Sequence, residues 1–274
     1  MHRAEAARDE LRVATTRAWS ELTWATGEAM TQQNHEAIRG QTLVVIGGSS
    51  GIGLETALRA RSEGADIVLT ARNPERLTKV ATAMGVSRIY NFDANDSFAL
   101  ASFFKELEGP IDHVLVTAGG PTYGPLLEMS AQEVTTALSD HIVLALEVAR
   151  HAVGRMRAGG TLLFVGGTGG RRIGRGSGIV SAATAALPPF TAALALEVAP
   201  VRVNLIAAGF VDTPLSAALL GDQLEARRAE LRRTLPIGRV VGPADVAALA
   251  VHIMTNTAIT GATYDIDGGQ QFTE

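Results

Sequence analysis

From residue 41 onward, short apolar runs alternate with helical segments, and this alternation limits the folds open to the chain. Near-continuous runs of Val, Leu and Ile are typical of strands that are buried on both faces. The predicted strands cover residues 42–46, 66–70, 90–92, 113–117, 161–165, 201–206 and 264–266. The predicted helices cover residues 52–63, 74–84, 97–107, 131–157, 180–198 and 243–254. The pattern predicts one α/β domain, a doubly wound parallel sheet of about seven strands with helices on both faces.

The first 40 residues differ in composition from the rest of the chain. They contain both tryptophans, only two of the 29 glycines, and a mixture of acidic and basic residues. Leu11, Thr15 and Ala18 recur at helical spacing, which is typical of an amphipathic helix. The sequence therefore predicts a helical or disordered extension over residues 1–40 and one folded domain over residues 41–274. The extension is either a docking helix or a weakly attached segment, and both interpretations remain open.

Composition excludes several classes of function. The chain has no cysteine, which rules out disulfides, a thiolate nucleophile and cysteine-based metal sites. The net charge of −4 lacks the basic surplus of a general nucleic-acid binder. The six histidines show no metal-ligand spacing, and no apolar stretch approaches the ~20 residues of a membrane span. We therefore expect a cytoplasmic protein that acts on a small molecule and binds no metal, nucleic acid or membrane.

The first predicted strand runs directly into a glycine-rich turn, Gly47-Gly48-Ser49-Ser50-Gly51-Ile52-Gly53, after which a helix begins. Glycine allows a sharp turn and lets the backbone approach a pyrophosphate closely. The unpaired N–H groups and the dipole at a helix start favour phosphate groups. The turn therefore predicts a Rossmann-type dinucleotide site. The residues predicted to hold the cofactor here are Gly47, Ser49, Ser50, Gly51 and Ile52.

The same turn also fits the nucleophile elbow of the α/β-hydrolases, G-x-S-x-G, with Ser49 as the nucleophile. The elbow normally follows several strands and an upstream oxyanion loop. Here it follows the first predicted strand, which favours the dinucleotide interpretation. A non-redox hydrolase or lyase remains an alternative.

The end of the second predicted strand bears on the choice of cofactor. An NAD site usually offers an acidic side chain there for the ribose 2′-hydroxyl. This chain has Arg72 instead, and an arginine suits the 2′-phosphate of NADP. The sequence therefore favours NADP(H) over NAD(H), although Arg72 also fits an ordinary surface position.

Taken together, these motifs resemble the short-chain dehydrogenase/reductase family over residues 41–271. The matching motifs, besides the glycine-rich turn, are Asp93, Thr117-Ala118-Gly119, Arg202-Val203-Asn204, residues 208–214 and residues 259–269. The resemblance implies NAD(P) bound across the carboxyl ends of the strands, and a homodimer or homotetramer. It also implies cofactor contacts from Asp93, Ala94, Ala118, Gly119, Gly209, Val211 and Thr213.

The catalytic residues of that family are not found at the matching positions. The family uses a serine, a tyrosine, a lysine and an asparagine. These positions correspond here to Gly167, Val180, Thr184 and His141, respectively. Valine cannot donate the proton that carbonyl reduction needs, and threonine cannot supply the charge that lowers the pKa of a tyrosine. The resemblance is therefore to an atypical member of the family.

His141 is the candidate substitute for the missing acid, because imidazole titrates near neutral pH. Alternatively, it only forms a backbone hydrogen bond in place of the asparagine. Tyr123 could reach a substrate or serve as part of a lid. We expect an NADP(H)-dependent oxidoreductase that transfers hydride to a small carbonyl- or imine-like substrate without the usual tyrosine. The alternative is a catalytically silent NADP(H)-binding sensor or scaffold.

Several side chains outside these motifs carry structural predictions. Asp212 precedes Thr213-Pro214 and is expected to cap the helix that follows. Pro188-Pro189 is expected to kink or break the predicted helix 180–198. Three arginines of one loop either bind an anionic substrate or are solvated; they are Arg171, Arg172 and Arg175. The charge-rich segment 225–233 is expected to be a solvated helix face.

Overall fold

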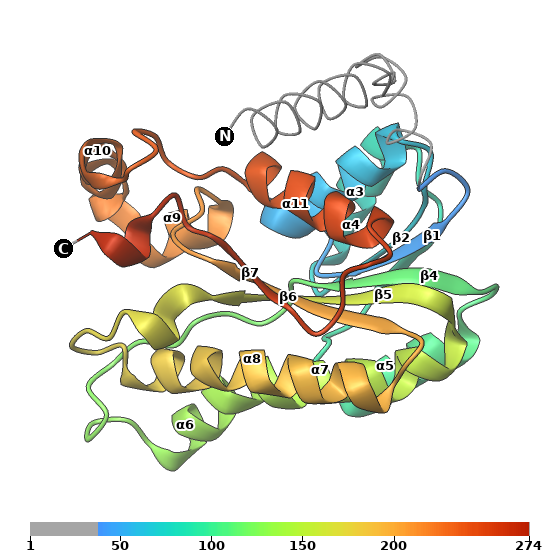
Figure 1. The fold of residues 1–274 in the computed structure, drawn as a ribbon, viewed down its shortest axis with the longest axis horizontal. Helices are drawn as coiled ribbons and strands as arrows, with labels where there is room; N and C mark the ends of the chain where they lie inside the picture. The colour runs from blue at the N-terminus through green and yellow to red at the C-terminus, as the bar shows by residue number, and fades with distance from the viewer. Residues whose placement is uncertain (1–37, 274) are drawn as a thin grey trace, which may run out of the picture. The chain divides into compact units, whose positions relative to one another are not determined.

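Residues 38–273, which the computed structural model describes, are built around a seven-stranded parallel sheet (Figure 1). The strands are β1 (Thr42–Ile46), β2 (Asp66–Ala71), β3 (Ile89–Asn91), β4 (Ile111–Val116), β5 (Met156–Gly167), β6 (Arg202–Ala208) and β7 (Thr263–Ile266). Their order is β3-β2-β1-β4-β5-β6-β7, so the chain winds outward from β1 and then from β4. The predicted doubly wound sheet is confirmed. The predictions for residues 1–37 lie outside the described residues.

Helices cover both faces of the sheet. Their bounds are α3 (Gly51–Ser62), α4 (Pro74–Met84), α5 (Ser97–Glu106), α6 (Ala131–Leu138), α7 (Leu144–Ala152), α8 (Gly178–Glu197), α9 (Pro214–Leu220), α10 (Leu224–Thr234) and α11 (Pro243–Thr255). Helices α3, α4 and α11 lie on one face, and α5, α7 and α8 on the other (Figure 1). Val44 and Ile46 pack toward α5, α7 and α8, whereas Leu43 and Val45 pack toward the opposite layer. This burial on two sides explains the continuous apolar run of β1.

The helix predicted over 131–157 is present as continuous helical backbone from α6 to α7, with a π-helical stretch in the middle, but it ends earlier than predicted. A π-turn, η1 (Ser139–Val143), joins α6 to α7, and a short 3-10 turn, η2 (Val153–Arg155), follows α7. Strand β5 then begins at Met156, so the predicted helix extends too far. A side chain at Gly160 would collide with the Asp112 carbonyl oxygen, because β5 approaches β4 closely there. Gly154, Gly159 and Gly160 indicate that the helix ends in this region, because glycine is unfavourable in a helix interior.

Helix α8 runs unbroken through Pro188-Pro189, so the predicted break is wrong. The prolines remove two backbone donors, yet buried side chains pack α8 into the fold on both sides of them, including Leu187 and Leu194. Packing of this kind supplies most of the stability of a helix in a protein. In the described part of the chain, α8 alone is long and apolar enough to cross a membrane, and half of it is buried, as in a core helix.

A small helical lid lies between β6 and α11 and consists of α9, the 3-10 turn η4 (Gly221–Gln223) and α10. It lies at the carboxyl end of the central strands (Figure 1). Leu231 is the buried residue of α10, and Arg227 pairs with Glu230 one turn along the same helix. The segment 225–233 is therefore largely solvated, as predicted.

Candidate cofactor and substrate site

The glycine-rich turn between β1 and α3 has the tight geometry that the sequence predicts. Gly47 has φ +99° and Gly51 has φ +56°, values that favour glycine. A side chain at Gly53 would collide with the Gly47 carbonyl oxygen, and one at Gly47 would lie 2.8 Å from Thr117 Oγ1. Ser50 is the N-cap of α3, but its side chain makes no capping hydrogen bond. The first amides of α3 are therefore not capped by a side chain of their own turn.

Two other strand ends converge on this turn. Thr117, which directly follows β4, donates its hydroxyl proton toward the carbonyl oxygens of Ile46 and Gly47, each at 3.2 Å. The side chain of Thr213, after β6, lies 3.5 Å from the position of a Cβ at Gly51. The structure therefore brings residues 47–51, 117–119 and 211–213 to one edge of the sheet. The tight glycine turn and the α3 start without a side-chain cap fit a bound pyrophosphate.

Arg72 and Asp93 lie together at the ends of β2 and β3. Their closest charged atoms, Nη1 of Arg72 and Oδ2 of Asp93, are 3.8 Å apart, and the Arg72 side chain is 74% exposed. A long, exposed ion pair of this kind contributes little stability and leaves the guanidinium free to bind another anion. Ala94, by contrast, is buried in the core beside α5. Any role of Ala94 beside an adenine would therefore come from its backbone.

The three positions Gly167, Val180 and Thr184 form a packed contact where β5 ends against α8. A Cβ at Gly167 would lie 3.5 Å from Cγ2 of Thr184. The Thr184 hydroxyl donates to the Val180 carbonyl oxygen at 2.8 Å, and both residues are buried. These side chains bring no ionisable group to the carboxyl end of β5.

His141 lies in the π-turn η1, which packs beside α8. Its Nδ1 lies 3.0 Å from the Ala137 carbonyl oxygen. A carbonyl only accepts, so Nδ1 carries the hydrogen and Nε2 remains the nitrogen that can exchange a proton. The amide of Asn95 donates to Asp140 Oδ1 at 2.7 Å, which ties the π-turn to the loop after β3. No local sequence pattern predicts this hydrogen bond, because the two residues are 45 positions apart.

Tyr123 lies in the loop between β4 and α6, and its side chain is 60% exposed. Partial burial raises the pKa of its hydroxyl, so the group keeps its proton at neutral pH. The same loop is joined to the loop after β5, because the Gly124 amide donates to the Gly176 carbonyl oxygen at 2.8 Å. Tyr123 therefore suits a contact residue better than a proton donor.

Two of the three loop arginines are occupied by contacts within the fold. Arg171 forms an ion pair with Asp265 and donates to Gln271 Oε1 at 3.2 Å. Arg172 donates to the Gln270 carbonyl oxygen at 2.9 Å. Both side chains therefore hold the C-terminal segment against the loop after β5. Of the three arginines, Arg175 alone can still either bind an anionic substrate or be solvated, the two interpretations drawn from the sequence.

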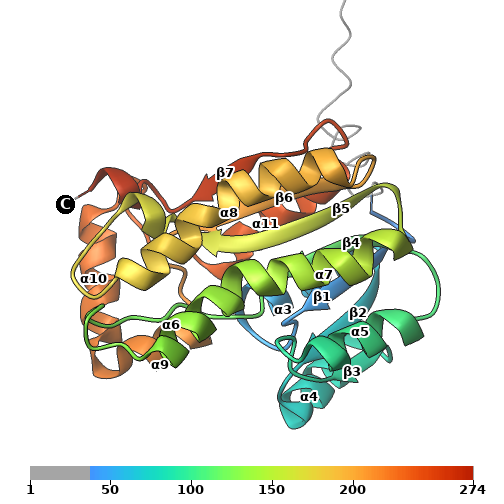
Figure 2. The same ribbon diagram turned by 90° about the horizontal axis from the view of Figure 1, so that it is seen from below.

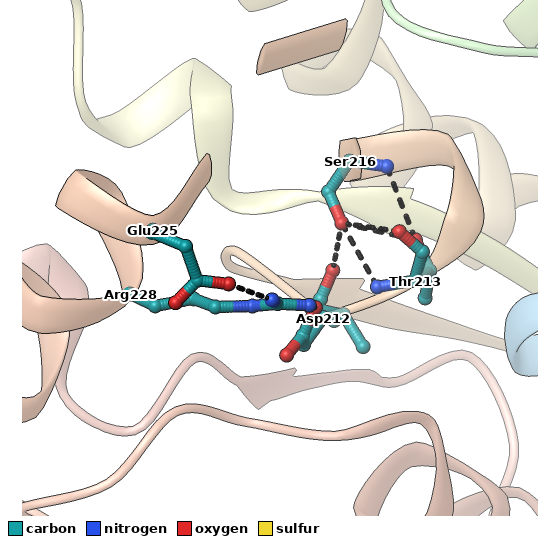
Figure 3. Close-up of polar contacts among 6 residues, drawn as sticks. Asp212, Thr213, Ser216, Glu225 and Arg228 are labelled. Carbon is teal, nitrogen blue, oxygen red and sulfur yellow. Dashed lines mark hydrogen bonds and ion pairs between the residues drawn. The ribbon is translucent and has the colours of Figure 1, made fainter. Parts of the chain in front are cut away.

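A group of hydrogen bonds attaches the lid to the segment that follows β6 (Figure 3). Thr213, and not the predicted Asp212, is the N-cap of α9: Ser216 Oγ accepts from the Thr213 amide and donates to the Val211 carbonyl oxygen, both at 2.8 Å. The Asp212 carboxylate instead accepts from Arg228 Nη2 at 2.6 Å, and Arg228 also pairs with Glu225. The pairing raises the pKa of Arg228. The prediction for Asp212 failed because its partner lies on another helix.

No group of three or more metal-ligating side chains is present among residues 38–273. The parallel sheet and the glycine-lined turn at its carboxyl edge define a Rossmann-type α/β protein. Residues 46–271 match a family model described as enoyl-(acyl carrier protein) reductase. A relative from Stachybotrys chlorohalonatus, short-chain dehydrogenase/reductase ATR9, is 31% identical over 250 residues, which are 85% of this chain and 97% of the relative.

Solved structures agree with this assignment. MalC reductase/Diels-Alderase from Malbranchea aurantiaca shares the fold with a TM-score of 0.81 at 23% identity, over 87% of this chain and 99% of that chain. A small-chain dehydrogenase in complex with NADPH is 27% identical with a TM-score of 0.74, over 85% of this chain and 99% of that chain. The chain belongs to the short-chain dehydrogenase/reductase family.

Proposed function

We propose that the protein is an NADP(H)-dependent oxidoreductase that reduces a carbonyl- or imine-like group without a tyrosine acid. The glycine-rich turn carries this proposal, because Gly47 and Gly53 let it pack tightly against Thr117 and its own backbone, and the first amides of α3 keep no side-chain cap from Ser50. The relative solved with NADPH supports the choice of cofactor. The exposed Arg72 guanidinium supports a 2′-phosphate over a 2′-hydroxyl.

When bound, the nicotinamide supplies a hydride to the carbon of a C=O or C=N bond. The oxygen or nitrogen then needs one proton, which neither Val180 nor Thr184 provides. His141 is the candidate donor through Nε2, since Nδ1 is committed to the Ala137 carbonyl. An iminium substrate already carries its proton, so it needs no acid from the protein. The residues therefore fit an iminium best, and a ketone or a neutral imine with a proton from His141 or water.

NADPH oxidation over a panel of ketones, enones, quinones and cyclic imines tests the proposal. We expect turnover above the solvent background, with His141→Gln slowing ketones but leaving iminium substrates unchanged. A protein that binds NADPH tightly and oxidises none of the panel would be inconsistent with an oxidoreductase.

A second candidate is a silent NADP(H)-binding sensor or scaffold. The packing of Gly167 against Thr184, which bonds to the Val180 carbonyl, favours it, because the usual acid and its charged partner are both absent. A sensor must bind NADP⁺ and NADPH with different affinities. Calorimetric titration with NADP⁺ and with NADPH measures the two affinities. Equal affinities would reject the sensor, and the absence of turnover as well would reject the oxidoreductase.

We also propose that the protein forms a homodimer or homotetramer through α8. One face of α8 is exposed and almost wholly apolar, with the members Ala182, Ala185, Ala186, Pro189, Ala192, Ala193 and Leu196. Small side chains let two helices approach closely. Sedimentation of the wild type and of Ala186→Glu tests the proposal, and a monomeric wild type would reject it.

A further inference from the structure

Large apolar side chains are concentrated in the three segments that follow β4, β5 and β6. Of the large hydrophobic residues that are exposed in the described chain, six lie in these segments: Tyr123, Leu126, Leu127, Ile173, Leu215 and Leu219. We call these six residues the apolar rim. Leu127 is fully exposed and Ile173 is 79% exposed. Single exposed leucines are ordinary on protein surfaces, but a group at one end of a fold usually marks a binding surface.

The three segments lie at the same end of the sheet as the glycine-rich turn. Both views place the loops after β4 and β5 and helix α9 at the same end of the sheet in the described domain (Figures 1 and 2). The Gly124–Gly176 hydrogen bond joins the first two segments, and Leu126 packs against Gly178. The third segment begins at Thr213, which lies beside Gly51. The apolar rim therefore borders the edge where the cofactor is proposed to bind.

Charges in these segments are mostly neutralised by partners within the fold. Arg171 is paired with Asp265, and Asp212 is paired with Arg228. Arg172 donates to the Gln270 carbonyl and keeps its positive charge, which acts on the nearby Glu230 carboxylate. Residues 117–130, 168–177 and 209–220 contain two other charged side chains, Glu128 and Arg175, of opposite sign. An anionic substrate would thus meet one unpaired arginine and one carboxylate, which is a weak anion site.

We propose that the substrate is an uncharged molecule with an extended apolar part that contacts the apolar rim. The proposal rests on the proposed oxidoreductase function and adds the class of substrate. Leu127 and Ile173 contribute little packing to the free protein because they are so exposed. Their apolar surface is removed from water only when a ligand or partner covers it, and that burial favours longer apolar substrates.

The experiment uses the full chain with NADPH and a series of neutral methyl ketones of increasing chain length. Each chain length has a matched ketone that ends in a carboxylate. We expect kcat/KM to rise about threefold to fourfold for each added methylene, and the carboxylates to be poorer by at least tenfold. The double variant Leu127→Ser/Ile173→Ser should flatten the dependence on length. The matched control is Leu58→Ser, because Leu58 is an exposed leucine of α3, outside the rim segments.

A second measurement does not depend on turnover. Binding of the neutral fluorescent probe N-phenyl-1-naphthylamine is titrated in the presence of NADP⁺. We expect the double variant to weaken probe binding at least fivefold and Leu58→Ser to leave it unchanged. If the probe binds in this way but no ketone, enone, quinone or cyclic imine of the panel is reduced, the proposed function fails while the apolar site stands.

Two outcomes would overturn the inference. If carboxylated ketones are reduced better than neutral ones, and Arg175→Gln removes that preference, the substrate is anionic and the oxidoreductase function stands. If the double variant changes the sedimentation of the protein but not probe binding or chain-length dependence, the apolar rim is a protein interface.

Discussion

His113, on β4, should make the protein lose stability as the pH falls below neutral. Its ring is 2% exposed, and Nε2 lies 2.6 Å from Gln41 Oε1, so Nε2 carries the hydrogen. Nδ1 is buried and has no hydrogen-bond partner within the described residues. Burial lowers the pKa of His113 from 6.5 to about 3, and the nearby Arg202 guanidinium adds to this effect. A proton on Nδ1 would therefore be a buried charge without an acceptor.

The size and sign of the effect follow from these two values. Between pH 6.5 and 3 the unfolded chain binds a proton at His113 that the folded chain does not bind. Folding stability is therefore fully present above pH 6.5 and falls by up to about 1.4 kcal/mol for each pH unit below it. Between pH 7 and pH 5 this histidine alone should remove about 2 kcal/mol from the free energy of unfolding.

Urea unfolding at pH 7, 6 and 5 tests this for the wild type and for His113→Gln, which keeps an amide donor but cannot titrate in this range. We expect the wild type to lose about 2 kcal/mol more than the variant. His252→Gln, at an exposed histidine of α11, serves as the control and should retain the wild-type loss. Equal losses in the wild type and His113→Gln would refute the assignment of a neutral, buried His113.

Three other predictions test the lid, the α8 contact and the cofactor edge. Arg228→Gln should speed hydrogen exchange across residues 214–234 because it frees α10 from Asp212, whereas Arg227→Gln on the same helix should not. Gly170→Ala should lower Tm by several degrees, because the new Cβ would lie 2.8 Å from Ala185 Cα. Gly167→Ala is the control and should leave Tm nearly unchanged, because its Cβ would lie 3.5 Å from the nearest atom, Thr184 Cγ2. Arg72→Gln should weaken NADPH binding about tenfold and leave NADH binding unchanged in calorimetry, and equal weakening of both would contradict the 2′-phosphate assignment.

The lid shows most clearly where prediction from the sequence ended. Asp212 precedes Thr213-Pro214, a pattern that predicts the start of a helix, and helix α9 does begin at Pro214. Thr213 takes the capping position, however, and Asp212 binds Arg228, which lies on α10. Arg171 likewise pairs with Asp265 on β7, far away in sequence. Partners such as these depend on how helices pack, which no local spacing encodes.

Local physical rules were enough to predict the sheet and the glycine-rich turn. A strand that is buried on two faces must be apolar throughout. The turn must lack a side chain at Gly53, because a Cβ there would collide with the Gly47 carbonyl oxygen. Both features can therefore be recognised from residues that are adjacent in the sequence. The tertiary structure decided what the site offers for chemistry. It packs Gly167 against Thr184, bonds Thr184 to the Val180 carbonyl, and turns His141 Nδ1 back onto its own helix. Those arrangements arise because side chains from separate strands and helices share one small volume, and only the folded chain determines which of them meet.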